Sequence, residues 1–187
     1  AIENKVITSS TILHDVPTTF EGTYKPLDYD RGFRGDVLPR RALANSLNIP
    51  ALHVQEKVGV PATLDYVRDM GITSLSSSQD YGLALVLGAG EVPLIEMTEA
   101  YGVFANEGVR AEPTTILEIK DKNDKTIYKH DVEKKTVMPE SVAYIISSIL
   151  SDTRARAETF GNALNISRTA AVKTGTTNDY KDALTIG

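Results

Sequence analysis

The 187-residue chain carries 20 Lys and Arg against 25 Asp and Glu, a net charge of −5, and 41% of its residues are hydrophobic. This length suits one globular domain, and the balance of apolar and charged residues excludes a disordered chain. The acidic balance argues against binding to nucleic acid, because phosphate backbones attract basic surfaces. No apolar run approaches the roughly 20 residues that cross a bilayer, so the sequence contains no transmembrane segment.

The composition also narrows the chemistry. The chain has no cysteine, which excludes disulfides, thiolate nucleophiles and Cys-ligated zinc. Its three histidines, His14, His53 and His130, lie far apart without the spacing of a metal-binding motif, so we expect no metal and no cofactor. No G-x-S-x-G elbow is present, although a Ser-His-Asp triad assembled from distant residues stays open.

The first forty residues predict a strand and a long loop. Residues 5–13 are rich in Val, Ile and Thr, which favours a strand. Residues 15–37 contain three Gly, two Pro and many charges, which is typical of a surface loop. Loops of this length in compact domains tend to be functional or to belong to something missing.

Prolines then begin a succession of helices, which indicates a helical lobe. The predicted helices cover residues 39–45, 50–59 and 61–71. Gly59 and Gly71 serve as their C-terminal stops. Residues 82–90 are small and apolar, and both a strand and a tightly packed helix stay open there. Residues 93–106 have apolar side chains at helical spacing and predict the clearest long helix.

The second half of the chain changes character. Residues 114–120 and 126–129 alternate apolar and polar side chains around a polar turn, which predicts a hairpin. Residues 139–150 predict a helix, and residues 168–176 and 182–187 predict strands. The fold class is therefore α+β. Because the chain stops within a predicted strand, we expect a piece of a longer protein.

Two short motifs carry candidate chemistry. Residues 46–48 (S-L-N) lie between two predicted helices, where the ordinary interpretation is a helix stop followed by an N-cap. Residues 173–176 (K-T-G-T) end a predicted strand, where a glycine often marks the close approach of a ligand. The ordinary interpretation there is a strand end with a turn. Average residue usage predicts a K-T-G triplet by chance in about one chain in twenty-five, so its occurrence after an S-x-N turn is informative.

Together with their surroundings, these motifs resemble the transpeptidase domain of class A, bifunctional penicillin-binding proteins, whose signature combines S-x-x-K, an S-D-N-type triplet and K-T-G. The segments that carry the resemblance are RG at 34–35, RALANSLNIPA at 41–51, LGAGEV at 87–92, EAYGVFANEG at 99–108 and KTGTTNDYKD at 173–182. The resemblance covers nearly the whole chain. It implies a β-lactamase/transpeptidase-like fold, with an antiparallel sheet packed with helices beside a helical lobe.

One part of the family signature is absent. None of the 12 serines has a lysine three positions later, so the chain contains no S-x-x-K motif. In the family this motif precedes the S-x-N turn. We therefore expect residues 1–187 to be a partial transpeptidase domain, with the S-x-x-K segment before Ala1 and the final strands and terminal helix after Gly187.

The resemblance implies acyl transfer from D-alanyl-D-alanine stem peptides of peptidoglycan through a serine acyl-enzyme. Its catalytic residues in this chain would be Ser46, Asn48 and Lys173. Ser46 would relay a proton toward the leaving amine, and Asn48 would hold the peptide carbonyl. Lys173 would place a positive charge beside the cleft and lower the proton affinity of a neighbouring amine. Lacking the nucleophile, this chain alone is expected to be inactive.

The resemblance also assigns substrate binding to the K-T-G strand. Thr174 and Thr176 would offer hydroxyls to the terminal carboxylate, and the Thr176 backbone N–H would form half of an oxyanion hole. Gly175 would leave room for the substrate strand. The implied partners are peptidoglycan stem peptides and β-lactam antibiotics, and the implied location is the cell envelope outside the cytoplasm. Membrane attachment would come only from an N-terminal anchor outside this sequence.

Three alternatives stay open at this point. The chain could be a relative of the serine β-lactamases, or a noncatalytic penicillin-binding or sensing module that kept the fold and lost the chemistry. It could also be an ordinary α+β domain with two chance motifs. All readings that involve chemistry depend on one geometric expectation, that the turn holding Ser46 and Asn48 folds against the strand bearing Lys173.

Overall fold

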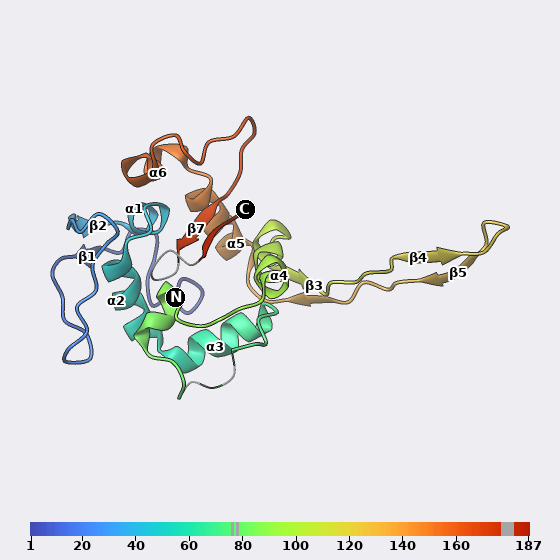
Figure 1. Cartoon of the computed structure of the whole chain (residues 1–187), viewed down its shortest axis with the longest axis horizontal. Coiled ribbons are helices and arrows are strands. Elements are labelled where there is room, and N and C mark those ends of the chain that lie inside the picture. Colours follow the sequence, from blue (N-terminus) through green and yellow to red (C-terminus); the bar gives the residue numbers. More distant parts are fainter. Residues whose placement is uncertain (76, 78, 177–181) are drawn as a thin grey trace.

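The computed structural model describes residues 1–75, 77, 79–176 and 182–187, and within them helices and short antiparallel strands form an α+β fold, as predicted (Figure 1). The helices are α1 (Pro39–Ala44), α2 (Asn48–Val58), α3 (Val60–Asp69), α4 (Leu94–Ala105), α5 (Glu140–Leu150) and α6 (Thr153–Phe160), with one 3-10 helix, η1 (Leu83–Leu87). The strands are β1 (Leu13–Asp15), β2 (Gly35–Val37), β3 (Val109–Ala111), β4 (Glu118–Lys120), β5 (Thr126–Lys129), β6 (Lys134–Thr136), β7 (Lys173–Thr176) and β8 (Ala183–Ile186).

The described strands pair two by two. β1 pairs with β2, β3 with β6, β4 with β5 and β7 with β8, each pair antiparallel. An isolated two-stranded pair is only marginally stable in water, so each depends on what packs around it. The β1–β2 pair joins the two ends of the long segment 15–37, since Leu13 lies opposite Val37.

The proline-started helices form where the sequence predicts them. Pro39 lies at the beginning of α1 and Pro61 at the beginning of α3, where a missing N–H does no harm. α2 begins at Asn48, two residues before Pro50. Gly59 ends α2 and begins α3 with φ of 83°, a left-handed region that favours glycine.

The strand predicted over residues 5–13 is wrong. Only Leu13 of that range belongs to a strand, and the residues before it form turns. The Thr8 backbone N–H donates to the Thr11 hydroxyl at 2.8 Å, and the Thr11 N–H donates to the Thr8 carbonyl at 3.2 Å. Such local bonds of Thr offer the backbone an alternative to strand pairing, which the composition of the segment hides.

Three further segments depart from the prediction. Residues 82–90 fold around the 3-10 helix η1, so the helical alternative holds in a tighter form than expected. The strand predicted over 168–176 is confined to β7.

Helix α6 was not predicted. The sequence of α6, TRARAETF, has no apolar stripe, and its beginning depends on the Asp152 carboxylate, which accepts from the Ala155 N–H at 2.9 Å.

The predicted hairpin is confirmed as β4 and β5, and it is longer than the sequence indicated. β3 and β6 extend it back toward the body, and Figure 1 shows the whole ribbon projecting away from the helices as an arm. Apolar side chains on the arm stay exposed. Leu117, for example, is 69% exposed.

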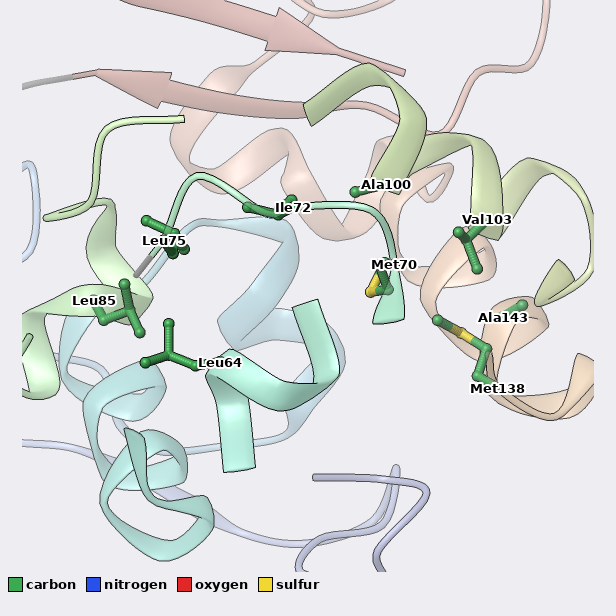
Figure 2. Packing of buried hydrophobic residues seen from close by; sticks show 9 residues of the cluster. All are labelled: Leu64, Met70, Ile72, Leu75, Leu85, Ala100, Val103, Met138 and Ala143. Atoms are coloured by element: carbon green, nitrogen blue, oxygen red, sulfur yellow. The ribbon is translucent and has the colours of Figure 1, made fainter. Parts of the chain in front are cut away.

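The largest buried cluster of apolar side chains lies between helices that are distant in sequence. It brings together residues of α3, η1, α4 and α5 with the loops beside them, as Figure 2 shows. Its members are Leu64, Met70, Ile72, Leu75, Leu85, Ala100, Val103, Met138 and Ala143. A second cluster beneath α1 contains Val37, Ala42 and Leu47. These two clusters hold α1 and α5 in place, and the candidate site lies beside both helices.

Candidate active site

The turn after α1 has a geometry that its sequence explains. The Leu47 N–H donates to the Ala42 carbonyl at 3.0 Å and the Ser46 N–H to the Leu43 carbonyl at 3.1 Å, the bond pair of a Schellman motif. Leu47 packs in the same apolar cluster as Ala42. Ser46 occupies the left-handed position, with φ of 57°, that such a motif requires. The motif fixes the backbone that carries the Ser46 hydroxyl.

Asn48 follows as the first residue of α2 and is held on two sides. Its backbone N–H donates to Oδ1 of Asp28 at 2.6 Å, and its side-chain Nδ2 donates to the Leu27 carbonyl at 2.7 Å. An amide nitrogen has two N–H groups, so the bond to Leu27 orients the Asn48 amide while leaving the second N–H for another acceptor.

Lys173 begins β7 and approaches the turn from a different part of the chain. The Val172 N–H donates to the carbonyl of Leu150, the last residue of α5, at 3.0 Å, which ties the strand to that helix. The Lys173 amine then donates to the Ser46 hydroxyl at 2.7 Å and to the Thr174 carbonyl at 2.7 Å. The structure thus brings the turn and the strand into direct contact.

Burial lowers the pKa of Lys173 below its ordinary value, because desolvation disfavours the ammonium form. Among the described residues, this desolvation is the cause of the shift. An amine whose pKa is lowered exchanges its proton more readily near neutral pH than a surface lysine does. Lys173 and Ser46 together can therefore pass a proton along their hydrogen bond.

All six residues that the sequence singled out line one cavity of about 990 Å³. They are Ser46, Asn48, Lys173, Thr174, Gly175 and Thr176. The remaining wall is largely apolar and includes Leu43, Val54, Phe104, Ile146 and Ile149. A cavity of this size with a few convergent polar groups has the character of a small-molecule or peptide site.

The K-T-G strand presents an open backbone to this cavity. Among the described residues, β7 has β8 as its one strand partner, with Gly175 opposite Leu184. Among the described residues, a Cβ added to Gly175 would meet nothing within 4 Å, so their packing does not require glycine there. An extended peptide could lie close to the backbone at this position.

The histidines lie apart from these residues. His14 pairs with Asp36 at 2.8 Å, and the His53 ring packs against Phe20 in a tilted arrangement, with ring centroids 4.9 Å apart and an interplanar angle of 56°. Within the described residues, no group of three or more His, Cys, Asp or Glu side chains could hold a metal ion.

Sequence reasoning missed the polar residues that support the turn. Asn45 is buried and donates to the carbonyls of Arg41 at 3.0 Å and Ala155 at 2.7 Å, while its Oδ1 accepts from the Thr159 N–H at 3.0 Å. It thereby joins α1 to α6. Asp28 supports Asn48 from the long loop. The position of Asn45, a polar residue directly before the S-x-N turn, could have indicated its supporting role. No feature of the sequence around Asp28 indicates its contact with Asn48.

An S-x-N turn hydrogen-bonded to a K-T-G strand is the motif pair shared by penicillin-binding proteins and class A β-lactamases. The family model for the penicillin binding protein transpeptidase domain matches residues 1–185. The chain belongs to this family.

Curated relatives place it among the class A members. The chain is 32% identical over 197 residues to penicillin-binding protein 1A of Neisseria meningitidis serogroup A, an alignment that covers 98% of the chain and 24% of the relative. It is 34% identical over 167 residues to penicillin-binding protein 1A of Aquifex aeolicus, covering 87% and 22%. The chain therefore spans about a quarter of the length of these relatives.

Solved structures share the fold. Penicillin-binding protein PonA1 of Mycobacterium tuberculosis matches with a TM-score of 0.82 at 21% identity, covering 98% of this chain and 53% of that one. The D,D-transpeptidase domain of a peptidoglycan glycosyltransferase from Eggerthella lenta matches with a TM-score of 0.81 at 18% identity, covering 97% and 52%. PonA1 has also been solved in complex with penicillin V. Among the helices described for this chain, none has the length and apolar character needed to cross a membrane.

Proposed function

We propose that this chain is part of a D,D-transpeptidase that cross-links peptidoglycan by acyl transfer from D-alanyl-D-alanine stem peptides. The observation that carries the proposal is the 2.7 Å hydrogen bond between Lys173 Nζ and Ser46 Oγ at the wall of one cavity. Membership of the penicillin-binding transpeptidase family supports it. The same site would be acylated by β-lactams, and the complex of the similar protein PonA1 with penicillin V supports this.

The reaction needs a serine nucleophile, which we place in an S-x-x-K motif outside this sequence. Its hydroxyl gives its proton to the lysine of that motif, its Oγ bonds to the carbonyl carbon of the penultimate D-Ala, the peptide C–N bond breaks, and the terminal D-Ala leaves as an amine. An amine from a second stem peptide then attacks the ester, the new amide forms, and the serine is regenerated. Two easier steps thus replace one difficult step.

Ser46 and Lys173 would move the proton. The leaving D-Ala nitrogen must gain a proton as the C–N bond breaks, and Ser46 Oγ can give one while it takes another from the Lys173 amine. The lowered pKa of Lys173 makes this exchange easier near neutral pH. In this role both residues are catalytic, with Asn48 holding the peptide carbonyl through its remaining N–H.

The strand β7 would bind the substrate as an added extended segment. Thr174 and Thr176 offer hydroxyls to the terminal carboxylate, and the Thr176 N–H forms half of the oxyanion hole. A single donor of this kind is worth about 3–4 kcal/mol in a comparable site. Gly175 allows the close approach, since its surroundings are open.

We propose that residues 1–187 form a partial domain whose cavity receives the helix with the S-x-x-K motif. The apolar wall fits such a segment, because Leu43, Val54 and Ile149 offer a surface that an amphipathic helix would cover. The small strand pairs would then be parts of the larger antiparallel sheet of a β-lactamase/transpeptidase-like fold. Because the substrate lies in the cell envelope, we place the whole protein there, outside the cytoplasm, with an N-terminal anchor.

A fluorescent penicillin tests the proposal. The protein encoded with its upstream S-x-x-K segment should form a labelled band that survives denaturing electrophoresis, and mutation of that serine should remove the band. The 187-residue chain alone should form no band. A covalent band on this chain alone would refute the placement of the nucleophile, and the absence of a band on the longer protein would favour a noncatalytic module.

A further inference from the structure

Asp28 lies in the segment that the sequence predicts as a long surface loop, yet its side chain is almost completely buried, with 3% of the residue exposed. Buried carboxylates are rare unless they are paired or hydrogen-bonded. Here Oδ1 accepts from the backbone N–H of Asn48 at 2.6 Å, and Oδ2 lies 3.4 Å from a guanidinium nitrogen of Arg34. The loop therefore places a buried carboxylate at the beginning of α2.

This contact replaces a helix cap. Leu47, the N-cap residue of α2, makes no side-chain cap hydrogen bond, and the first N–H groups of a helix have no partner within the helix. The Asp28 carboxylate supplies an acceptor from 20 positions earlier, where a negative charge also suits the helix dipole. The carbonyl of Leu27, its chain neighbour, holds the Asn48 side chain at 2.7 Å. Asp28 and Leu27 thus bind the backbone and the side chain of Asn48, respectively.

Asp28 lies near both a second carboxyl group, that of Asp15, and a positive charge, that of Arg34. Burial raises the pKa of Asp28 to about 6, the Asn48 N–H opposes this, and the neighbouring Asp15 carboxyl adds to it. Asp15 is fully buried and its Oδ2 accepts from the Arg34 N–H at 2.7 Å. The described charged groups around this pair include Arg34 and Arg41, Asp30, which pairs with Arg34 at 2.6 Å, and Glu158 of α6, which contacts Arg34 at 3.1 Å and Arg41 at 2.8 Å.

We propose that Asp28 is a positioning residue for acyl transfer, because its hydrogen bond to the Asn48 N–H fixes the Ser46–Asn48 turn against Lys173. This inference rests on the proposed function. The turn contains a serine in the left-handed region, a conformation that persists where surrounding contacts over-determine it. Asp28 is such a contact, and a displacement of about 1 Å in a catalytic group can reduce a rate on the order of a hundredfold.

The experiment measures the second-order rate of acylation by a fluorescent penicillin in the longer protein that carries this chain and the nucleophile. Asp28→Ala removes the acceptor and should lower the rate about tenfold or more at pH 7.5. Asp28→Asn keeps an acceptor oxygen, so its rate should stay within about threefold of the unmodified protein. Asp30→Asn is the matched control, since it removes a carboxylate that contacts the same arginine but not Asn48.

A pH series separates positioning from a purely structural role. A carboxylate accepts a stronger hydrogen bond than a neutral acid or amide does, so the rate of the unmodified protein divided by that of Asp28→Asn should rise through about pH 6. Ionisations shared by both proteins cancel in this ratio. The ratio also decides the matter if Asp28→Ala does not fold.

Three results would overturn the inference while leaving the proposed function intact. They are an Asp28→Ala rate within twofold of the unmodified protein, an equal loss in Asp28→Asn and Asp28→Ala, and a rate ratio that stays flat with pH. If the unmodified longer protein is not acylated at all, the proposed function fails and the positioning role fails with it.

Discussion

The amine of Lys173 donates to the hydroxyl of Ser46 across 2.7 Å, although the two residues lie 127 positions apart in the chain. The turn that carries Ser46 is held by its Schellman bonds and by the Asp28 contact to Asn48, and the strand that carries Lys173 is tied to α5. Neither side chain needs to move to make the contact. A preorganised pair of this kind suits proton transfer, because no reorganisation is required at the moment of reaction.

Replacement of the Ser46 hydroxyl should therefore slow acylation without unfolding the protein. Ser46→Ala in the longer protein removes the bridge to Lys173, and positioned proton transfer is worth about a hundredfold or more. The measurement is the acylation rate with fluorescent penicillin. Ser9→Ala, at an exposed serine outside the cavity, is the control and should behave like the unmodified protein. An unchanged rate in Ser46→Ala would exclude Ser46 from the relay.

Lys173 should make stability depend on pH in a defined direction. Burial lowers its folded-state pKa below the unfolded value of 10.5, so the unfolded chain binds the proton more strongly. This unfavourable contribution is complete below the folded pKa and disappears as pH rises to 10.5. Lys173→Met removes it. The melting temperature of Lys173→Met relative to the unmodified chain should therefore fall between pH 7 and pH 10.5.

The control for this titration is Lys129→Met, because Lys129 lies exposed on β5. The difference in melting temperature between Lys129→Met and the unmodified chain should not change over the same pH range. If Lys173→Met gives the same flat difference, the Lys173 amine is not desolvated in the folded chain.

Two glycines of one region should respond in opposite ways to alanine. Gly108, just after α4, has φ of 91°, and an added Cβ would collide with the backbone carbonyl of Met138. Gly108→Ala should lower the free energy of unfolding by about 2–4 kcal/mol. Gly102 lies within α4 and is open to a Cβ, so Gly102→Ala should raise it by about 0.5–1 kcal/mol. Urea unfolding curves measure both, and equal effects would contradict the close approach at Met138.

The projecting arm should be the first part of the folded chain that trypsin cuts. The turn between β4 and β5 carries exposed lysines and lies well away from the helices in Figure 1. Mass spectrometry of short digests should find the first cleavages at Lys120, Lys122 and Lys125. Replacing these three lysines with Gln should delay the first cut. Early cleavage within α2, at Lys57, would show that the body opens as readily as the arm.

Helices α1, α2 and α3 were predictable because their signals are local. Pro39 and Pro61 mark helix beginnings and Gly59 a helix end, and each acts within its own turn of chain. The prediction of a strand over residues 5–13 failed because the composition of this segment favours a strand, whereas hydrogen bonds involving the Thr8 and Thr11 side chains hold it in turns. The β3–β6 ladder was missed because it joins residues that lie 23 to 27 positions apart, such as Val109 and Thr136, and because most of its side chains are charged or small.

The candidate site likewise contains residues that the sequence indicates and residues that it does not. Ser46, Asn48 and the K-T-G strand could be singled out as candidates because the motif pair is recognisable in the sequence itself. Asp28 and Asn45 escaped because their roles exist only in the folded chain. An aspartate among many charged loop residues looks solvated, and its contact to Asn48 depends on a loop path that no periodicity encodes.

The left-handed backbone of Ser46 has a practical consequence for anyone who engineers this domain. Gly and Asn adopt φ near 57° more readily than serine does, so a laboratory selection for heat resistance alone would favour either of them at position 46. Under the proposed mechanism, such variants would be more stable but could not relay the proton through position 46. A selection for stable variants of this domain should therefore also measure labelling by penicillin from the first round. Otherwise it will gather variants that are more stable and less active.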